Sequence, residues 1–286
     1  MSTTATGYTG RFAPSPTGPL HAGSLVAALA SFLDARATGG QWLLRIDDID
    51  PPRAVAGATE RILACLDAHG LRHDGVIRYQ SERNSAYDAA LTRLAALGHT
   101  FHCNCTRRSL APTGECIADC GQREADPEPQ SSIRIRVPKD WVDTFEDTIL
   151  GQQQLALGAS CRNFILRRRD GLYAYQLACA VDDGAPDISH VIRGADLLAS
   201  THRQRWVQTC LGLTPPTYGH LPVLTDSAGN KLSKQTGATA LDNRLAAANL
   251  RQALASLGQT VPAEHATAEQ ILSTAVRLWS PASVPR

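Results

Sequence analysis

The chain has 286 residues, of which 43% are hydrophobic and 19% are charged, and its formal net charge at pH 7 is +1. This length suffices for one large domain or two modest ones, and the composition is typical of a globular protein. No run approaches the roughly 20 apolar residues that a membrane-spanning helix needs. The near-neutral charge excludes a broadly basic surface, so a nucleic acid would have to dock on a local patch.

The first ten residues have neither the basic start nor the apolar core of a signal peptide, so we expect a cytoplasmic protein without a membrane partner. We also expect a monomer. In that compartment, eight cysteines favour metal binding or burial over a disulfide framework. Four of them cluster within residues 103–120. The scattered ones are predicted to pack in the core as small hydrophobes, and these are Cys65, Cys161, Cys179 and Cys210.

The first hundred residues alternate between predicted strands and helices. The strands cover residues 11–13 and 42–46, and the helices cover residues 25–37, 54–69 and 85–97. A loop with three prolines and two glycines joins the first strand to the first helix. This order favours a parallel sheet with crossover helices.

The second half of the chain mixes polar segments with shorter elements. A polar linker at residues 121–130 follows the cysteines. Strands are predicted at residues 132–137 and 188–192, with a hairpin or a strand–turn–helix at 164–175. Helices are predicted at about residues 195–211, 242–256 and 267–278.

Two segments indicate a nucleotide site, although the chain has neither a P-loop nor a dinucleotide-binding fingerprint. The first, residues 11–24, ends a predicted strand and opens a helix, whose N-terminus attracts anions. Gly18 and Gly23 would let a nucleotide approach the backbone, and His21 could donate a hydrogen bond to a phosphate oxygen. The alternative is a proline-rich turn that only caps the helix.

The second segment has the sequence KLSKQ, at residues 231–235. The chain has 28 basic residues, yet only three are lysines, at positions 139, 231 and 234. A compact ammonium on a flexible stem suits a point contact to a phosphate better than a guanidinium fork does. A solvated surface loop is the alternative interpretation.

These segments resemble the signatures of the class I aminoacyl-tRNA synthetases. HAGS at residues 21–24 resembles their HIGH motif, and KLSKQ resembles their KMSKS loop. RFAPSPTG at 11–18, LLRIDDID at 43–50 and VIRGADL at 191–197 resemble the glutamyl branch, and the likeness covers about residues 10–240.

The resemblance implies an α/β fold, in which a Rossmann-like class I catalytic domain contains an inserted zinc-binding subdomain and ends in a short helical C-terminus. The expected divisions are residues 8–98 and 136–225 for the two halves of the catalytic domain, 99–135 for the zinc insertion, and 226–286 for the KMSKS-like loop and C-terminal helices.

The resemblance also implies the site residues. The ATP-binding set is Pro14, His21, Gly23, Ser24, Lys231 and Lys234, with His21, Lys231 and Lys234 as the catalytic residues and Mg²⁺ bound mainly by the phosphates. The glutamate-binding set is Arg11, Phe12, Ala13, Pro14, Ser15, Asp47, Tyr175 and Arg193.

The residue chemistry agrees with a glutamate substrate, which carries two carboxylates and one ammonium. Arginine is suited to the carboxylates and an acid to the amine. Arg11 and Arg193 would bind the former and Asp47 would face the latter. The family usually has Glu in place of Asp47, so a water molecule could bridge the shorter arm to the amine. In the alternative interpretation, Asp47, Asp48 and Asp50 only cap the following helix.

The expected reaction is that of a ligase, in which ATP activates glutamate as glutamyl-adenylate without tRNA. Only 51 residues follow Gln235, and this shortness resembles the glutamyl-Q tRNA(Asp) synthetase family, which transfers glutamate to queuosine in the anticodon of tRNA(Asp). Two alternatives stay open. One is a truncated glutamyl-tRNA synthetase that charges a tRNA 3′ end with a partner, and the other is a non-catalytic paralogue that binds tRNA or ATP.

The cysteine cluster predicts one structural zinc ion. Its ligands would be Cys103, Cys105, Cys116 and Cys120, spaced C-x-C, ten residues, then C-x₃-C. Two close pairs can supply the tetrahedron of thiolates that zinc prefers, and four protein ligands leave no position for catalytic water. The alternatives are His102 as a ligand, or thiols that merely pack.

Overall fold

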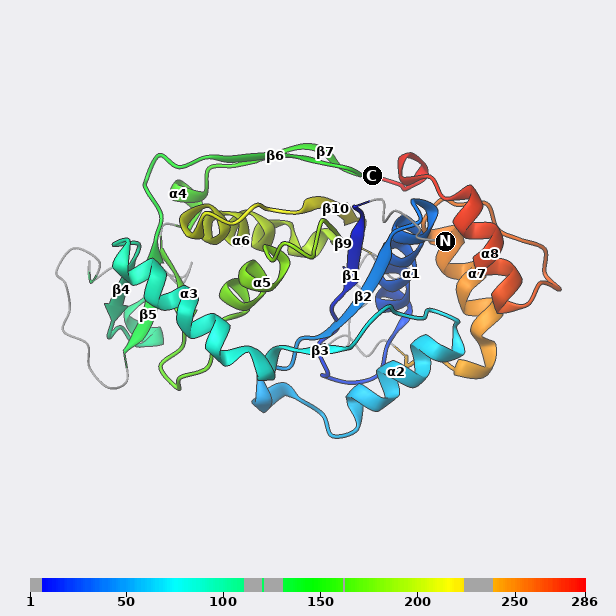
Figure 1. The fold of residues 1–286 in the computed structure, drawn as a ribbon, viewed down its shortest axis with the longest axis horizontal. Helices are drawn as coiled ribbons and strands as arrows, with labels where there is room; N and C mark the ends of the chain where they lie inside the picture. The colour runs from blue at the N-terminus through cyan, green and yellow to red at the C-terminus, as the bar shows by residue number, and fades with distance from the viewer. Residues whose placement is uncertain (1–6, 111–119, 121–130, 162, 224–238) are drawn as a thin grey trace.

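The computed structural model describes residues 7–110, 120, 131–161, 163–223 and 239–286. At its centre two groups of parallel strands lie edge to edge, in the orders β3-β2-β1 and β9-β10-β6 (Figure 1). Strands β1 and β9 lie side by side, and the backbone N–H of Ser189, next to β9, donates to the carbonyl oxygen of Thr9 over 3.0 Å. The strands are β1 (Thr9–Phe12), β2 (Gln41–Ile46), β3 (Arg78–Tyr79), β6 (Asp143–Asp147), β9 (His190–Gly194) and β10 (Thr217–Leu221). The predicted parallel α/β sheet is therefore confirmed.

Helix α1 (Ala22–Ala37) packs against this sheet. Its buried residues Leu25, Leu29 and Leu33 recur every four positions and form one continuous apolar face. The C-terminal helices α7 (Ala246–Ser256) and α8 (Ala268–Leu278) pack on α1 and share its hydrophobic core (Figure 1). The C-terminal helices therefore complete the core around α1 and its strands.

A second core forms at the opposite end of the molecule from α7 and α8 (Figure 1). It contains the helices α3 (Asn84–Ala96), α5 (Tyr175–Asp183) and α6 (Leu198–Leu211). They pack near an antiparallel sheet of β4 (Thr100–Cys103), β5 (Ser132–Arg136) and β8 (Asn163–Arg167). The cysteine segment leaves this sheet at the end of β4.

The sequence analysis did not anticipate the hairpin of β6 and β7 (Gly151–Leu155). Strand β6 alternates buried and exposed residues, with Phe145 buried between two buried aspartates. One of them, Asp147, closes the turn, because its Oδ1 accepts hydrogen bonds from the backbone N–H groups of Ile149 and Leu150. Acidic residues are typical of solvated loops, so the aspartates at both ends of β6 gave no indication of a strand in the sequence.

Several boundaries differ from the predictions for local reasons. The predicted helix at 54–69 begins only with α2 (Ala58–Ala68), because Pro51–Arg53 forms a separate 3₁₀ turn and Gly57 adopts a left-handed conformation at φ +69°. Residues 164–175 form the strand–turn–helix alternative, with Gly171 in the turn and α5 beginning at Tyr175. All four scattered cysteines are buried, as predicted. The remaining short helices are Gln80–Arg83, Arg107–Ser109, Leu157–Ser160 (α4), Ala195–Leu197, Asn243–Leu245 and Pro281–Ser283.

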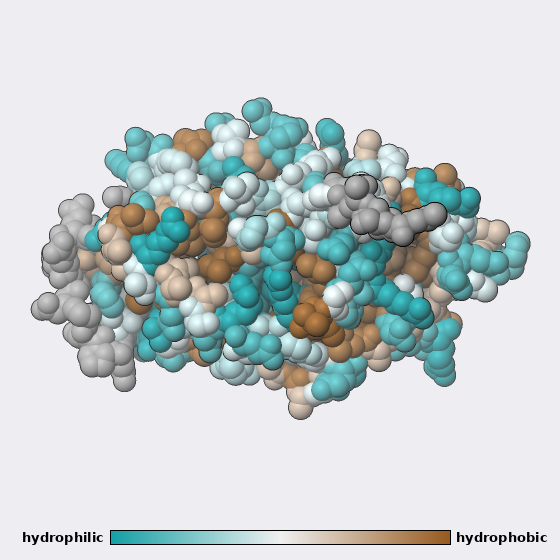
Figure 2. Space-filling view, in the orientation of Figure 1, coloured by the Kyte–Doolittle hydropathy of each residue, from teal (hydrophilic) through white to brown (hydrophobic). Residues whose placement is uncertain are grey.

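The visible face of the molecule is mixed in character. Hydrophobic residues form scattered patches among hydrophilic ones in Figure 2. Within the described ranges, no helix combines the length and the apolar character that crossing a bilayer requires.

Candidate active site

The proline-rich loop crosses the carboxyl ends of β1 and β2. Its carbonyl groups at Pro14 and Pro16 accept hydrogen bonds from the backbone N–H groups of Asp47 (3.0 Å) and Val55 (2.9 Å). Gly18 lies in this loop at φ +141°, a region that favours glycine. The loop is therefore fixed to the segment that follows β2.

His21 is the N-cap residue of α1. The backbone N–H of Ser24 donates to its Nδ1 over 3.4 Å. Because Nδ1 accepts, the neutral ring carries its hydrogen on Nε2, which can donate. His21 thus caps the helix, and this cap leaves it in the tautomer that donation to a phosphate oxygen requires.

A pocket of about 220 Å³ lies between this loop and strand β9. Seven of the eight residues predicted to bind glutamate line it, together with Ser24 from the ATP set. The seven are Arg11, Phe12, Ala13, Pro14, Ser15, Tyr175 and Arg193. The structure thus brings together residues from β1, α5 and β9.

Arg193 is the unusual group in this pocket, because it is only 4% exposed. Its Nη2 donates to Thr201 Oγ1 and to Gln204 Oε1, both over 2.7 Å. Its Nη1 is buried and has no hydrogen-bond partner among the described residues, none of which forms an ion pair with this guanidinium. A buried cation with an unsatisfied N–H beside a pocket favours an anionic ligand.

Arg193 is also held by a hydrogen-bonded pair, His220 and Asp147. His220 Nδ1 lies 2.5 Å from Asp147 Oδ2, and its Nε2 accepts from Arg193 Nε over 3.5 Å. Burial lowers the pKa of His220, although the hydrogen bond to Asp147 opposes that shift. Burial alone would raise the pKa of Asp147, but hydrogen bonds, first from His220, lower it. The pair is therefore an ionised carboxylate and a neutral imidazole, and the sequence analysis missed both residues.

Arg11 is held by an aspartate that the sequence analysis also missed. Its Nε and Nη2 donate to the two carboxylate oxygens of Asp183 over 3.0 and 2.8 Å. Arg45 Nη1 donates to the same carboxylate over 2.6 Å. Burial alone would raise the pKa of Asp183, but the attraction of Arg11 and Arg45 holds it far below its usual range. Nη1 of Arg11 donates to no carboxylate among the described residues and can therefore bind one of a substrate.

Asp47 does not line the pocket of Arg11 and Arg193. Its carboxylate is bound by Arg45, with Nε to Oδ1 at 2.6 Å, and lies 3.6 Å from Cys179 Sγ. Burial raises the pKa of Asp47, while Arg45 opposes that shift. Asp47 instead lines an adjoining pocket of about 290 Å³, which shares Ser15, Thr17 and Tyr175 with the first.

The neighbouring aspartates do not use their side chains as helix caps. Asp48 accepts hydrogen bonds from the backbone N–H and the hydroxyl of Ser81, over 2.8 and 2.7 Å. Asp50 is the N-cap residue of the 3₁₀ turn, but its carboxylate pairs with Arg53 and makes no capping bond. The capping alternative is therefore wrong for these side chains.

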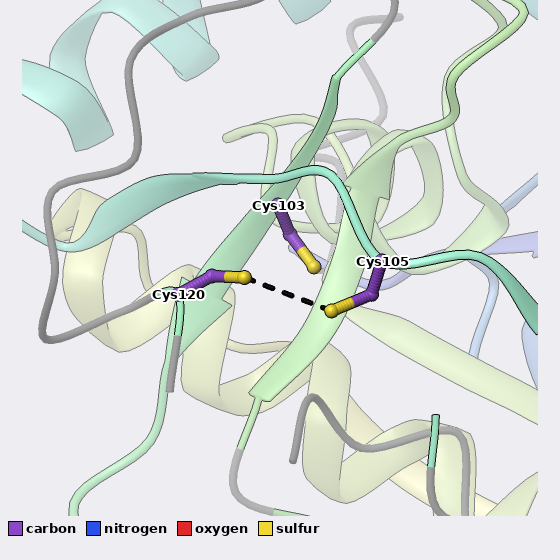
Figure 3. Close-up of side chains that lie close together, drawn as sticks. All are labelled: Cys103, Cys105 and Cys120. Atoms are coloured by element: carbon purple, nitrogen blue, oxygen red, sulfur yellow. Dashed lines mark hydrogen bonds between the residues drawn. The ribbon is translucent and has the colours of Figure 1, made fainter. Parts of the chain in front are cut away.

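Three of the four predicted zinc ligands converge at the end of β4. The sulfur atoms of Cys103, Cys105 and Cys120 all lie within 4.8 Å of one another and point toward a common centre (Figure 3). Cys105 Sγ and Cys120 Sγ are 3.6 Å apart. The fourth, Cys116, lies outside the described residues. Among the described residues, His102 belongs to no such cluster, and its Nδ1 lies 2.6 Å from Ser131 Oγ.

Lys231 and Lys234 also lie outside the described residues. The described chain that follows them is close to the loop of residues 13–21. Strand β10 ends at Leu221 beside β9, and the backbone N–H of Leu241 donates to the carbonyl oxygen of Leu20 over 3.1 Å.

Comparison with known proteins places this geometry in a family. The family described as "tRNA synthetases class I (E and Q), catalytic domain" matches residues 8–272. A glutamyl-Q tRNA(Asp) synthetase of Chromobacterium violaceum is 46% identical over 97% of this chain and 95% of its own length. Its counterpart from Xanthomonas axonopodis pv. citri is 49% identical over 98% of this chain and 93% of its own length.

Solved structures agree on the fold. A glutamate–tRNA synthetase from Elizabethkingia anophelis has a TM-score of 0.81 at 24% identity, and it matches 97% of this chain. A glutamate–tRNA ligase from Elizabethkingia meningosepticum, solved with its amino acid, has a TM-score of 0.80 at 25% identity. The chain spans only 66% and 65% of these two proteins. The chain matches the two glutamyl-Q tRNA(Asp) synthetases over almost their full length. It therefore belongs to the glutamyl-Q tRNA(Asp) synthetase family of class I tRNA synthetases.

Proposed function

We propose that this chain activates glutamate with ATP, without tRNA, and then transfers the glutamate to queuosine in the anticodon of tRNA(Asp). The observation that carries the first step is the buried Arg193, whose Nη1 has no partner in the described chain and which lines the pocket with Arg11. A dicarboxylic amino acid supplies the anion that this arginine lacks. The relatives named glutamyl-Q tRNA(Asp) synthetase support the second step.

Glutamate would bind with its carboxylates toward the free Nη1 groups of the two arginines. Asp183 and the Asp147–His220 pair fix these arginines before the substrate arrives. Ser15 and Tyr175 line both pockets, so a glutamate beside them would direct its amine toward Asp47. The carboxylate of Asp47 is already bound by Arg45, which makes a water-bridged contact the better fit.

Activation requires a glutamate carboxylate oxygen to attack the α-phosphorus of ATP, with pyrophosphate as the leaving group. Such a step depends on alignment and on stabilising the added negative charge. We assign this role to the N-terminus of α1, to His21 and to the lysines of residues 231–235, with Mg²⁺ held by the phosphates. Gly23 and Ser24 belong to the first turn of α1 and would approach the nucleotide through their backbone.

The transfer step follows from the mixed anhydride. A hydroxyl of the acceptor attacks the activated carbonyl carbon, the bond to the phosphate oxygen breaks, and AMP leaves. The pocket of Arg11 and Arg193 holds the amino acid while the acceptor approaches from another side.

We also propose a structural zinc ion in the insertion of residues 99–135. Three thiols within 4.8 Å of one another suit a tetrahedral thiolate site, and Cys116 would supply the fourth ligand. Metal analysis of the purified protein should find about one zinc per chain, in keeping with such a closed four-cysteine site. Replacing Cys116 by Ser should weaken zinc retention, whereas a folded, metal-free segment would contradict the site.

Two assays test the enzyme function. Glutamate-dependent ATP–pyrophosphate exchange should proceed without tRNA, and its absence from zinc-replete protein would overturn the activation step. Labelled glutamate should then be transferred to tRNA(Asp) that carries queuosine, but not to tRNA(Asp) that lacks it. Equal charging of tRNA(Glu) at its 3′ end would contradict the proposed acceptor.

A further inference from the structure

The pocket that adjoins the glutamate pocket extends beyond the groups assigned above to the amino acid. Its volume of about 290 Å³ is at the small end of ligand sites. One wall, formed by Ser15, Thr17 and Tyr175, is common to both pockets. A molecule bound there would lie next to the activated glutamate.

Three aspartates line this pocket, at positions 47, 48 and 50, together with two arginines, Arg53 and Arg168, which both pair with Asp50. Gln80 is completely buried, and its Nε2 donates to Asp182 Oδ2 over 2.9 Å. Its Oε1 is buried without a hydrogen-bond partner in the part of the chain that the structure describes. A buried carbonyl in this state costs free energy unless a ligand or water donates to it.

Asp48 adds an unpaired negative charge to the same pocket. Its two oxygens accept hydrogen bonds from Ser81, but none of the described residues forms an ion pair with it. Its neighbours differ, since Asp47 pairs with Arg45, and Asp50 pairs with Arg53. The pocket therefore favours a ligand that carries a cationic amine and hydroxyl donors.

The lining also includes apolar and aromatic residues. Pro16, Ile49, Ile165 and Tyr173 form walls that would contact a small hydrocarbon ring. Queuosine matches this combination, because it joins a secondary amine to a cyclopentene ring that bears two hydroxyl groups. A protonated amine would pair with Asp48, and a ring hydroxyl would donate to Gln80 Oε1.

We propose that this pocket is the acceptor site, and that it selects the aminomethyl-cyclopentenediol of queuosine through Asp48 and Gln80. The proposal rests on the function proposed above. The shared wall places the second ring hydroxyl beside the carbonyl carbon of the activated glutamate. A tRNA 3′ adenosine also offers a diol, but it has no cationic amine to pair with Asp48.

The test variant is Asp48→Asn, which removes the charge but keeps an oxygen that can accept from the Ser81 N–H group. Transfer of labelled glutamate to queuosine-containing tRNA(Asp) should fall about 10-fold or more in kcat/KM, as expected for a lost charged hydrogen bond. Glutamate-dependent ATP–pyrophosphate exchange should fall much less. The matched control is Asp67→Asn, an exposed carboxylate on α2, which should alter neither assay.

A second measurement uses free bases as competitors. Queuine should inhibit transfer by the wild-type protein, and 7-aminomethyl-7-deazaguanine, which has an amine but no diol, should inhibit it less. Asp48→Asn should weaken inhibition by queuine.

Three outcomes would count against the site. Unchanged transfer by Asp48→Asn would overturn it, and so would equal losses of transfer and exchange, because Asp48 would then serve the fold. No transfer by the wild-type protein, with normal exchange, would overturn the proposed acceptor itself and this site with it.

Discussion

The glutamate pocket and the cysteine cluster acquire their order in different ways. In the pocket, protein carboxylates already hold the arginines, as Asp183 holds both Arg11 and Arg45. In the cluster, the thiols converge at the end of β4, where only Cys103 is buried and the other two are half-buried. Internal ion pairs can preorganise a site before its ligand arrives, whereas a thiolate cluster gains its order from a metal. The comparison predicts that the two regions respond differently to the same kinds of perturbation.

The largest expected effect is that of Arg193→Met in the glutamate pocket. This change removes the one buried guanidinium there that has no carboxylate partner within the described ranges. We expect kcat/KM for glutamate in ATP–pyrophosphate exchange to fall about 10² to 10³-fold, as for a lost buried charge pair, while the KM for ATP changes little. Arg277→Met, on the exposed side of α8, is the control. A loss confined to the KM for ATP would mean that Arg193 belongs to the nucleotide site.

Asp183→Asn tests whether internal ion pairs preorganise the pocket. The carboxylate binds two buried arginines, so its loss should lower the free energy of unfolding by about 3 kcal/mol or more. The KM for glutamate should also rise, because Arg11 loses its anchor. Denaturant unfolding and exchange kinetics measure the two effects, and an unchanged KM would show that Arg11 is placed by other contacts.

The same carboxylate should appear in the acid dependence of stability. The pKa of Asp183 is lowered in the folded protein, where the pull of Arg11 and Arg45 exceeds the opposing effect of burial. Its stabilisation is therefore complete above the unfolded value of about 4 and is lost as the pH falls toward the folded value. Below about pH 4, the free energy of unfolding of the wild type should therefore fall more steeply with decreasing pH than that of Asp183→Asn, as measured by denaturant unfolding.

Zinc removal tests the other side of the comparison. Chelation should lower the melting temperature of the protein and loosen the cysteine segment, because the proposed zinc ion would hold that segment in place of a hydrophobic core. Glutamate-dependent exchange, measured without tRNA, should change by no more than about threefold, since a closed site of four thiolates performs no chemistry. If chelation abolished exchange while the protein stayed folded, the two regions would not be independent.

The sequence predicted one part of the active site and missed another for a physical reason. The strand, the proline-rich loop and α1 are local, and their periodicity and turn residues are visible in the sequence. The partners of the arginines are not local, since Asp183 lies 172 positions from Arg11 and Asp147 lies 73 positions from His220. Asp147 also lies in the unpredicted hairpin, where its role in the turn and against His220 depends on the folded sheet. Asp47, predicted to face the amine, lines the adjoining pocket, and its bond to Arg45, two residues away, was not foreseen.

The smallest expected effect is that of His220→Gln, behind the glutamate pocket. His220 contacts Arg193 but no substrate, so the KM for glutamate should rise only about 2- to 10-fold, as for one neutral hydrogen bond.

Burial lowers the pKa of His220 despite its bond to Asp147, so the unfolded chain binds a proton here more readily than the folded protein. Wild-type stability should therefore decrease as the pH falls from about 6.5 toward the folded value, and His220→Gln should show a shallower decrease. Burial lowers the pKa of His69 in the same way, but His69 is present in both proteins, so the difference between their pH profiles isolates His220. A raised KM with an unchanged pH profile would mean that the imidazole is already protonated in the folded protein, and the neutral link between Asp147 and Arg193 would be wrong.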